Sequence, residues 1–312
     1  MEPELRHLRH FVVVAEELHF RRAAERLHMA QPALSQSIKQ LEQRLGVTLL
    51  ERDTRNVRLT PAGAALLDDA QRILLTVNAA MRRAEAVAGS AGTVLHVGFM
   101  ATAAGPVTTP LVQSFEARNP DVRVELRYFG WGEHIAAVRD GVVDVGLVRH
   151  PVPDAEGIEL LPLLREQRLA VLWRDHPLAS RAAISVEELA DVPCLFSSSA
   201  DPEWWRFWTV ATRPGLEPHY SVDVNTPEEM FEAIALRRAT IITCASAHDA
   251  YAHPGLAWVP VHDVAPSEVS LAWRSGPVSP TTQRFIDAAV EIRDELRSLD
   301  WAIERDALPA PV

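Results

Sequence analysis

The stretch of sequence that decides the fold is LHFRRAAERLHMAQPALSQSIKQLEQRLGVTLLERDTRNVRLTPAG, residues 18–63. Apolar residues recur every three to four positions over 20–27 and again in the segment that begins near Pro32, which is typical of helices that bury one face. Pro32 fits the first turn of the second helix, and Gly46 fits its end. Two short extended segments within 48–59 then indicate a β wing. Together these features predict a winged helix-turn-helix.

The second of these helices carries polar side chains on the face opposite its apolar residues. Gln and Ser side chains on such a face can read base edges, and Lys or Arg can reach phosphates. On the helical pattern alone, an ordinary solvated face explains these side chains equally well. The DNA-binding interpretation assigns base readout to Gln31, Ser35 and Gln36, apolar base contact to Pro32, and phosphate contacts to Arg21, Lys39, Arg52, Arg55 and Arg58.

Helical spacing continues on both sides of this stretch. Residues 5–18 form an amphipathic pattern, and a long helix is predicted over 61–88. The apolar seam of the long helix is narrow and includes Leu66 and Ile73, which favours packing on a partner helix. We therefore expect a dimer held by this helix, and a hinge in the Gly-containing segment at 89–92.

The character of the sequence changes after this hinge. Between residues 94 and 148, strand and helix patterns alternate as βαβαβ, which indicates a parallel sheet. A second set of short strands and helices follows over 169–260. A strand at 269–273 and an amphipathic helix over 281–299 complete the pattern. The C-terminal two thirds of the chain therefore reads as an α/β region with two parts.

Several motifs in the first part of the chain resemble the DNA-binding head of LysR-type transcriptional regulators. The remainder, to about residue 300, resembles the same family more loosely, as at His176–Leu178. The sequence departs from the family pattern at Ala30, where Ser is frequent, at Gln36, where Arg is frequent, and at 237–240, where the family often has Gly-x-Gly. The matching motifs are Ala23-Ala24, Leu27, Gln31–Ser35, Leu41-Glu42, Leu45-Gly46, Leu49–Arg52 and Leu59–Gly63.

The resemblance implies a fold: an α/β protein with an N-terminal winged helix-turn-helix and a C-terminal periplasmic-binding-protein-like effector domain of two Rossmann-like subdomains. Two crossovers join the subdomains, near Leu164–Arg168 and Ala265–Val269. A ligand is then expected in the cleft between them, at strand ends and helix N-termini. The expected domains are the winged helix-turn-helix over 1–60, a linker helix and hinge over 61–92, an effector domain over 93–300 (subdomain 1 at 93–165 and 268–300, subdomain 2 at 166–267), and a tail over 301–312.

Candidate effector-binding residues follow the predicted strands or open the predicted helices at that cleft. For any one of them, ordinary loop or cap chemistry is an equal explanation, and Asn225 and Thr226 can simply cap the helix that follows. Trp204, Trp205 and Trp208 stand at helical spacing, which favours packing over a ligand cage. The candidates are Ala101, Thr102, Ala103, Gly130, Trp131, Arg149, Ser197, Ser198, Asn225, Thr226 and Thr243.

The candidate set favours a small anion, most simply a carboxylate, because it combines uncharged donors with helix N-termini. Arg149 adds a positive charge at the rim unless Asp144 or Asp154 pairs with it, and Trp131 can stack on an aromatic or unsaturated ligand. The net charge of −11 does not oppose this, because charges beyond about 8–10 Å are screened.

Catalytic and metal-binding motifs are missing from the sequence. It contains no His-Glu-x-x-His, Gly-x-Ser-x-Gly, Gly-x-Gly-x-x-Gly or Walker A motif. His248–His253 comes nearest to a metal cluster but lacks ligand spacing, while His7, His10, His19 and His28 read as surface or phosphate-side groups. We expect a regulator that is not an enzyme and that uses no cofactor or metal. The alternatives are a ligand sensor resembling solute-binding proteins, and an enzyme.

Charge is distributed unevenly along the chain. Residues 1–60 carry ten basic and eight acidic residues (+2), and the other 252 carry 21 and 34 (−13), which gives −11. A slightly basic N-terminal segment followed by a strongly acidic remainder is consistent with DNA binding by the N-terminal segment. No long apolar run or secretory signal is present, so we expect a cytoplasmic protein without membrane contact. The expected partners are double-stranded DNA with an interrupted palindrome, the small anionic effector, copies of the chain in a homodimer or homotetramer, and RNA polymerase.

Overall fold

The structure is a computed structural model that describes residues 4–52, 57–87, 94–100 and 105–298. The chain forms two compact units, Met1–Ala84 and Glu85–Val312. The hinge predicted at 89–92 and the tail predicted at 301–312 lie outside the described residues.

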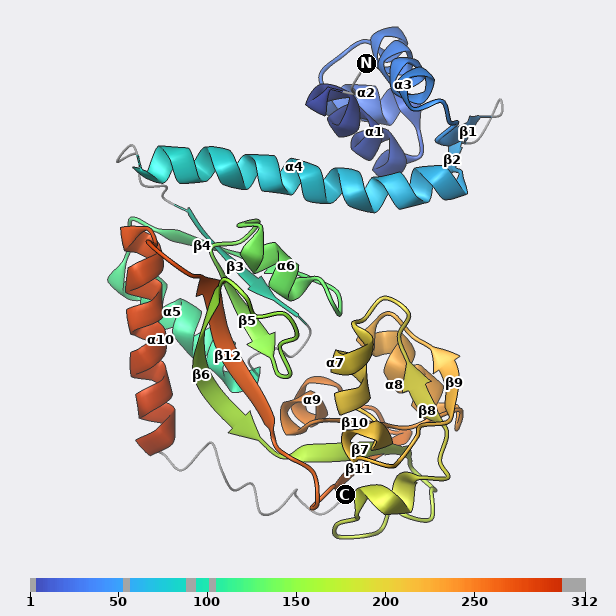
Figure 1. The fold of residues 1–312 in the computed structure, drawn as a ribbon, viewed down its shortest axis with the longest axis vertical. Helices are drawn as coiled ribbons and strands as arrows, with labels where there is room; N and C mark the ends of the chain where they lie inside the picture. Colours follow the sequence, from blue (N-terminus) through green and yellow to red (C-terminus); the bar gives the residue numbers. More distant parts are fainter. Residues whose placement is uncertain (1–3, 53–56, 88–93, 101–104, 299–312) are drawn as a thin grey trace. The chain divides into compact units, whose positions relative to one another are not determined.

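The first unit contains, in chain order, α1 (Leu5–Glu17), α2 (Phe20–Arg26), α3 (Gln31–Leu45), β1 (Leu50–Arg52), β2 (Val57–Leu59) and α4 (Pro61–Val87). The helices and wing predicted from the sequence are confirmed (Figure 1). Gly46, at a φ of +73°, ends α3 in the left-handed conformation that favours glycine. Thr60 begins α4 by accepting a hydrogen bond from the Gly63 N–H at 2.9 Å. The wing is an antiparallel pair in which Leu50 lies opposite Leu59.

The core of this unit lies between α1 and α3, with one face of α4 added. Phe11, Leu34, Ile38 and Leu41 have no exposed surface. Leu66 of α4 packs against the same core. Leu66 is half-buried, so it covers part of the core of its own unit, and its contact with a partner helix stays a prediction.

Farther along α4, the apolar side chains are exposed in the chain. Ile73 is 42% exposed and Met81 is 60% exposed. These two residues are eight positions apart, so their directions differ by about 80° around the helix and both fall within one broad apolar stripe. A face of this kind is available for a partner helix, as predicted for Ile73.

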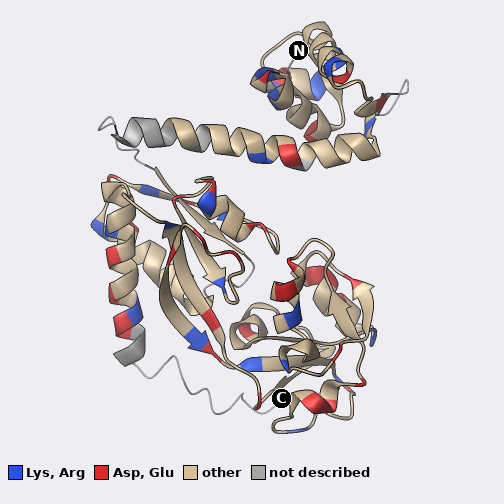
Figure 2. Cartoon of the chain, in the orientation of Figure 1, with Lys and Arg blue, Asp and Glu red and all other residues tan. Residues whose placement is uncertain are grey.

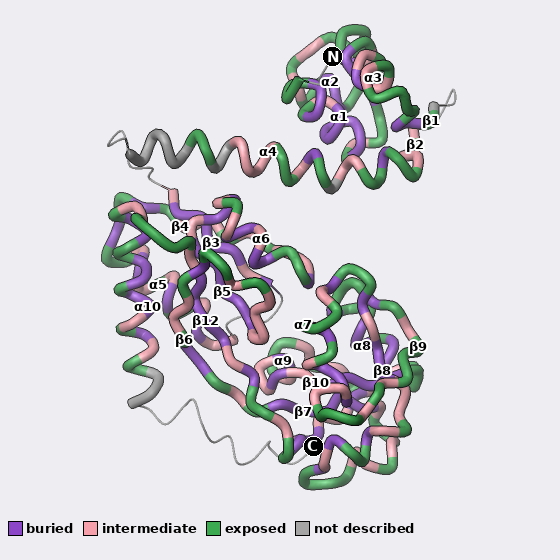
Figure 3. The backbone as a smooth tube through the Cα atoms, in the orientation of Figure 1, coloured by how far each residue is buried: buried purple, intermediate pink, exposed green. Residues whose placement is uncertain are grey.

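The first part of the second unit, called subdomain 1 here, contains β3 (Val94–Phe99), η1 (Gly105–Val107), α5 (Thr108–Arg118), β4 (Arg123–Tyr128), α6 (His134–Arg139), β5 (Val145–Arg149), β6 (Ile158–Glu166), β12 (Ser267–Arg274) and α10 (Pro280–Ser298). Its sheet has the order β4-β3-β5-β12-β6. The first three strands are parallel, as predicted, and β12 runs antiparallel to both of its neighbours. Figure 3 shows the central strands β3, β5 and β12 as mostly buried.

Subdomain 2 contains β7 (Arg168–Trp173), η2 (Val186–Leu189), β8 (Cys194–Phe196), α7 (Pro202–Phe207), η3 (Val210–Thr212), β9 (Tyr220–Asp223), α8 (Pro227–Ala235), β10 (Ile241–Cys244), α9 (Ala245–Ala250) and β11 (Leu256–Pro260). β7 lies between β10 and β11 and is antiparallel to both. β8 and β9 form a parallel pair. The helix α9 was not anticipated from the sequence, because its six residues are too few to show a period.

The chain passes between the subdomains twice, close to the predicted positions. A single residue, Gln167, separates β6 of subdomain 1 from β7 of subdomain 2. The return runs from Pro260 to the start of β12 at Ser267. Near the unusual 237–240 segment, Arg237 has a φ of +61° and so takes the left-handed conformation for which glycine is better suited.

Candidate nucleic-acid interface and ligand cavity

The helix α3 presents a polar face that is open to solvent in the chain. Gln31, Pro32, Gln36 and Lys39 are exposed, and Ser35 is half-buried. The structure thus brings the predicted contact residues of this helix onto one surface.

Two further positions on α3 differ from what the sequence predicted. The apolar spacing of this helix predicts that Ala33, Leu34, Ile38, Leu41 and Leu45 are buried, but Ala33 and Leu45 are exposed. The core contacts the stripe of Leu34, Ile38 and Leu41. Leu45 continues this stripe but is the last residue of α3.

Histidines of α1 hold α3 in place rather than lying free on the surface. His7 is 1% exposed, and its Nε2 lies 3.3 Å from Oε1 of Gln40. His10 Nδ1 lies 2.7 Å from Oγ of the buried Ser37. The prediction of a surface or phosphate-side role is wrong for His7, because the α1–α3 packing encloses it. Both contacts link α1 to the side of α3 opposite the polar face.

Several arginines of the head are engaged with acidic residues. Figure 2 shows basic and acidic residues close together on α1 and α2, where Arg26 pairs with Glu16 at 2.7 Å. Arg21 lies 3.8 Å from Glu25 with both side chains largely exposed, so this pair leaves Arg21 accessible. Arg58 of β2 is also exposed.

Two predicted phosphate contacts cannot be placed on this face. The side chain of Arg52 and the whole of Arg55 lie outside the described residues.

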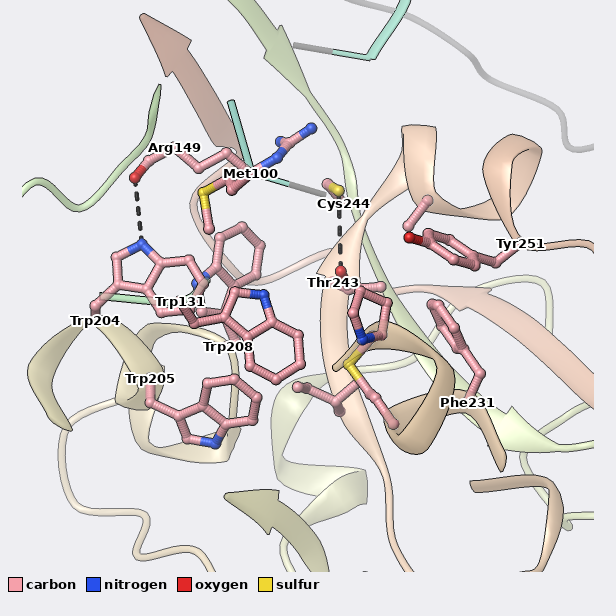
Figure 4. A pocket seen from close by; sticks show the side chains of 14 residues that line it. Met100, Trp131, Arg149, Trp204, Trp205, Trp208, Phe231, Thr243, Cys244 and Tyr251 are labelled. Carbon is pink, nitrogen blue, oxygen red and sulfur yellow. Dashed lines mark hydrogen bonds between the residues drawn. The ribbon is translucent and has the colours of Figure 1, made fainter. Parts of the chain in front are cut away.

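A cavity of about 50 Å³ lies between the subdomains of the second unit (Figure 4). Its walls are mainly aromatic and apolar. Trp131 of subdomain 1 contacts Trp205 of subdomain 2 with ring centroids 5.0 Å apart. Trp204 crosses the same boundary by donating its indole N–H to the Arg149 carbonyl oxygen at 3.2 Å. The lining residues are Met100, Trp131, Arg149, Trp204, Trp205, Trp208, Pro227, Met230, Phe231, Ile241, Thr243, Cys244, Ala247 and Tyr251.

Three of the predicted effector residues line this cavity: Trp131, Arg149 and Thr243. Trp204, Trp205 and Trp208 also line it, although their spacing favoured packing alone. They do both, since each is buried in the core of the unit and exposes one ring face or edge to the cavity. The sequence signal that could have identified them as lining residues is the presence of three tryptophans within five positions.

The other predicted candidates that the structure describes do not line the cavity. Ser198 Oγ donates to Asp223 at 2.7 Å. Thr226 caps α8 by accepting from the Glu229 N–H, and the Asn225 N–H donates to the Glu229 carboxylate. Ser197 contacts Ser199, and the Gly130 N–H donates to Glu133. Ala101, Thr102 and Ala103 lie outside the described residues.

Arg149 is not a charge at the rim. It is 3% exposed, and its Nη2 lies 2.7 Å from Oε1 of Glu166. Nη1 donates to Ser267 at 2.8 Å and Nη2 to Ser246 at 3.0 Å. The expectation of a free charge is wrong, because Glu166 at the end of β6 pairs with the guanidinium. The candidates Asp144 and Asp154 instead lie beside His96 and Arg139.

A second arginine, Arg168, is buried close to the cavity wall. It is 1% exposed, and its guanidinium lies 3.9 Å from the centroid of the Phe207 ring and 5.6 Å from that of Trp208. Its hydrogen bonds go to Thr212 Oγ1 and to the carbonyl oxygens of Ala265 and Phe207. Among the described residues no carboxylate pairs with it. Burial lowers the pKa of Arg168 to about 9, so the side chain remains charged at neutral pH.

Comparison with known proteins assigns both units to one family. Residues 5–64 match the bacterial regulatory helix-turn-helix proteins of the lysR family, and residues 88–293 match the LysR substrate binding domain. The chain belongs to the LysR family of transcriptional regulators. The first unit thus contains the family's helix-turn-helix, and the second contains the region that matches its substrate binding domain.

Relatives and solved structures agree with this assignment. YnfL, an uncharacterized HTH-type transcriptional regulator of Escherichia coli, is 41% identical over 199 residues, 63% of this chain. The chain spans only 63–66% of the length of this and two further relatives. BudR of Raoultella terrigena is 31% identical over 294 residues, 91% of this chain and 99% of BudR. The crystal structure of CbnR, a LysR family regulator, is 26% identical with a TM-score of 0.64 and covers 93% of this chain and 99% of CbnR.

Across the described part of the chain, no helix combines the length and the apolar character needed to cross a membrane.

Proposed function

We propose that this chain regulates transcription by binding an interrupted palindrome in double-stranded DNA, with α3 in the major groove. The exposed polar face of α3 is the observation that carries the proposal. A solved structure of full-length CbnR with its target DNA, 26% identical to this chain with a TM-score of 0.62, supports it. A two-fold dimer would place two such helices in successive major grooves, so the operator should be a dyad. Assembly into a homodimer or homotetramer, and contact with RNA polymerase, belong to the same proposal.

A mobility-shift assay on DNA selected from a random pool tests this proposal. We expect a selected site with two related half-sites, and binding that weakens steeply with salt. Gln36→Ala should relax base choice at one position at a cost of about 1–3 kcal/mol. Lys39→Ala and Arg55→Ala should weaken all sequences alike and flatten the salt slope. Arg237→Ala, an exposed arginine of the other unit, is the matched control.

Selection of unrelated sequences would overturn the DNA-binding proposal. A preferred site that is unchanged by Gln36→Ala but altered by Arg55→Ala would instead overturn the roles given to these residues.

We further propose that the cavity between the subdomains binds a small-molecule effector, most simply a small carboxylate. Its aromatic and apolar lining supports an organic ligand. Two arginines, Arg149 and Arg168, and one carboxylate, Glu166, lie at this boundary. Their charges sum to +1, which favours an anion. Because the Trp131 and Trp205 rings touch, a ligand of more than a few atoms would have to part the subdomains. An opening of this kind would give the second unit two arrangements. A ligand that favours one of them could alter DNA affinity, and the coupling free energy between two such sites is typically about 1–3 kcal/mol.

Calorimetry with a set of small monocarboxylic acids tests the cavity. Ala247 lines the cavity and is 2% exposed, so Ala247→Met should fill it and abolish binding, with folding checked by thermal unfolding. An acid that changes operator affinity but binds the Ala247→Met protein as tightly as the wild type would show that the effector site lies elsewhere.

A further inference from the structure

Trp208 lines the cavity with an indole N–H that has no hydrogen-bond partner among the described residues. The side chain is 4% exposed and lines the cavity. Within the described part of the chain its buried Nε1–H finds no acceptor, whereas the indole groups of Trp204 and Trp205 donate to the carbonyl oxygens of Arg149 and Leu195. In Figure 4 the Trp208 nitrogen lies on the edge of the ring that faces Thr243. A buried N–H without an acceptor is unfavourable, and such groups in native structures call for an explanation.

Arg168 strengthens this donor. Its guanidinium lies 5.6 Å from the centroid of the Trp208 ring, and no carboxylate among the described residues pairs with it. A cation near the face of an indole draws electron density from the ring and makes its N–H a better donor. The same charge, buried in a low-dielectric surrounding, also attracts an anion placed on the other side of the ring.

Arg149, by contrast, is poorly suited to hold a ligand anion. Both of its Nη atoms already donate to Glu166, Ser246 or Ser267. A carboxylate brought to this guanidinium would come close to Glu166 and meet like-charge repulsion. The anion is therefore better accommodated at Trp208 and Thr243 than at the cationic residue that first suggests itself.

We propose that the Trp208 N–H, backed by the Arg168 cation, anchors the carboxylate of a small monoacid. The Thr243 hydroxyl, which donates to Cys244 Sγ at 3.9 Å without ligand, would turn to the carboxylate as a second donor. The ligand's apolar body then lies against Phe231, Met230 and the remaining tryptophans. This inference rests on the proposed function, because it assigns the polar anchor of the same effector cavity. It also predicts that a single carboxylate on an apolar body is preferred to a diacid or a cation.

Isothermal titration of the full chain with benzoate and its neutral isostere benzamide tests the anchor. The key variant carries β-(3-benzothienyl)alanine at position 208, which keeps the shape of tryptophan but lacks the N–H. We expect wild type to prefer benzoate, and the variant to lose benzoate affinity about tenfold or more. Thermal stability without ligand should not fall, because the N–H has no partner to lose. The same replacement at position 205, whose N–H donates to Leu195, is the matched control: it should lower stability.

Arg168→Gln provides a second, independent measurement. It keeps a donor for Thr212 but removes the charge, so the ratio of benzoate to benzamide affinity should fall. The anchor is overturned if benzoate does not bind, if benzamide binds as tightly, or if the benzothienyl variant binds benzoate like the wild type. If another compound changes operator binding and loses its effect in Ala247→Met but not in the position-208 variant, the proposed function stands and only this inference falls.

Discussion

Nη2 of Arg149 lies 2.7 Å from Oε1 of Glu166. Arg149, the last residue of β5, is buried, and the side chain of Glu166, the last residue of β6, is 10% exposed. Ser246 of α9 joins the pair, because its N–H donates to Glu166 Oε2 at 2.6 Å. Gln167 is the only residue between Glu166 and the first strand of subdomain 2. The ion pair therefore braces the crossover and ties α9 to subdomain 1.

Breaking this pair from one side should destabilise the effector-binding domain. Glu166→Gln leaves the Arg149 guanidinium buried without its counter-charge, and removal of one partner of a buried pair typically costs about 3–5 kcal/mol. Urea unfolding of the full chain, followed by tryptophan fluorescence, measures the loss. The double variant Arg149→Met, Glu166→Leu should recover much of it, because neither charge then remains buried. A cost below about 1 kcal/mol for Glu166→Gln would contradict the bracing role.

Assembly should depend on the exposed apolar face of α4. Ile73→Glu or Met81→Glu would place a charge where the two helices of a dimer meet, and light scattering at micromolar concentration should show a smaller species. Ala64→Glu, at an exposed position nearer the start of the same helix, is the control. Leu66→Glu should instead unfold the head, since Leu66 packs against its core. A wild-type monomer under these conditions would refute the dimer.

The start of α4 should not tolerate a side chain at Gly63. A Cβ added there would lie 2.1 Å from the Leu49 carbonyl oxygen, a backbone atom that cannot move without shifting the wing. Gly63→Ala should therefore cost about 1–3 kcal/mol, the usual range for overpacking, and weaken operator binding by displacing β1. Thermal unfolding and a mobility-shift assay measure the two effects. Ala64→Ser, one residue later and exposed, should leave both unchanged.

The head could be predicted closely because its signals are local. Helical spacing, Pro32 and Gly46 fix α3, and its polar face follows from the same period. What the sequence did not show was the depth of each side chain, so His7 was placed on the surface and Ala33 in the core. These assignments depend on how α1 crosses α3, which no local pattern encodes.

The cavity was harder to predict because its residues meet through long-range packing. Strand ends pointed to Trp131, Arg149 and Thr243, all of which line the cavity. The counter-charge of Arg149 was sought among acidic residues near it in sequence, but Glu166 comes from the neighbouring crossover. Ser198 satisfied the same sequence pattern as the lining residues, but its hydroxyl donates to Asp223 at the end of β9.

His134 should make the stability of the effector-binding domain depend on pH. Its side chain is 5% exposed, neither ring nitrogen has a hydrogen-bond partner among the residues that the structure describes, and burial lowers its pKa to about 4. Between its unfolded pKa of about 6.5 and this value, only the unfolded state takes up the proton. The free energy of unfolding should therefore fall as the pH drops from about 6.5 to 4, by about 3 kcal/mol in total at about 1.4 kcal/mol per pH unit.

His134→Leu isolates this contribution, because other groups titrate equally in both proteins. At pH 7 the variant should be as stable as the wild type or more stable, since leucine leaves no unsatisfied polar atom at the site. Its advantage should then grow by about 3 kcal/mol as the pH is lowered to 4. Urea unfolding at pH 7, 6, 5 and 4 gives the difference directly. A difference that stays constant across this range would mean that the imidazole takes up its proton in the folded protein as readily as in the unfolded chain.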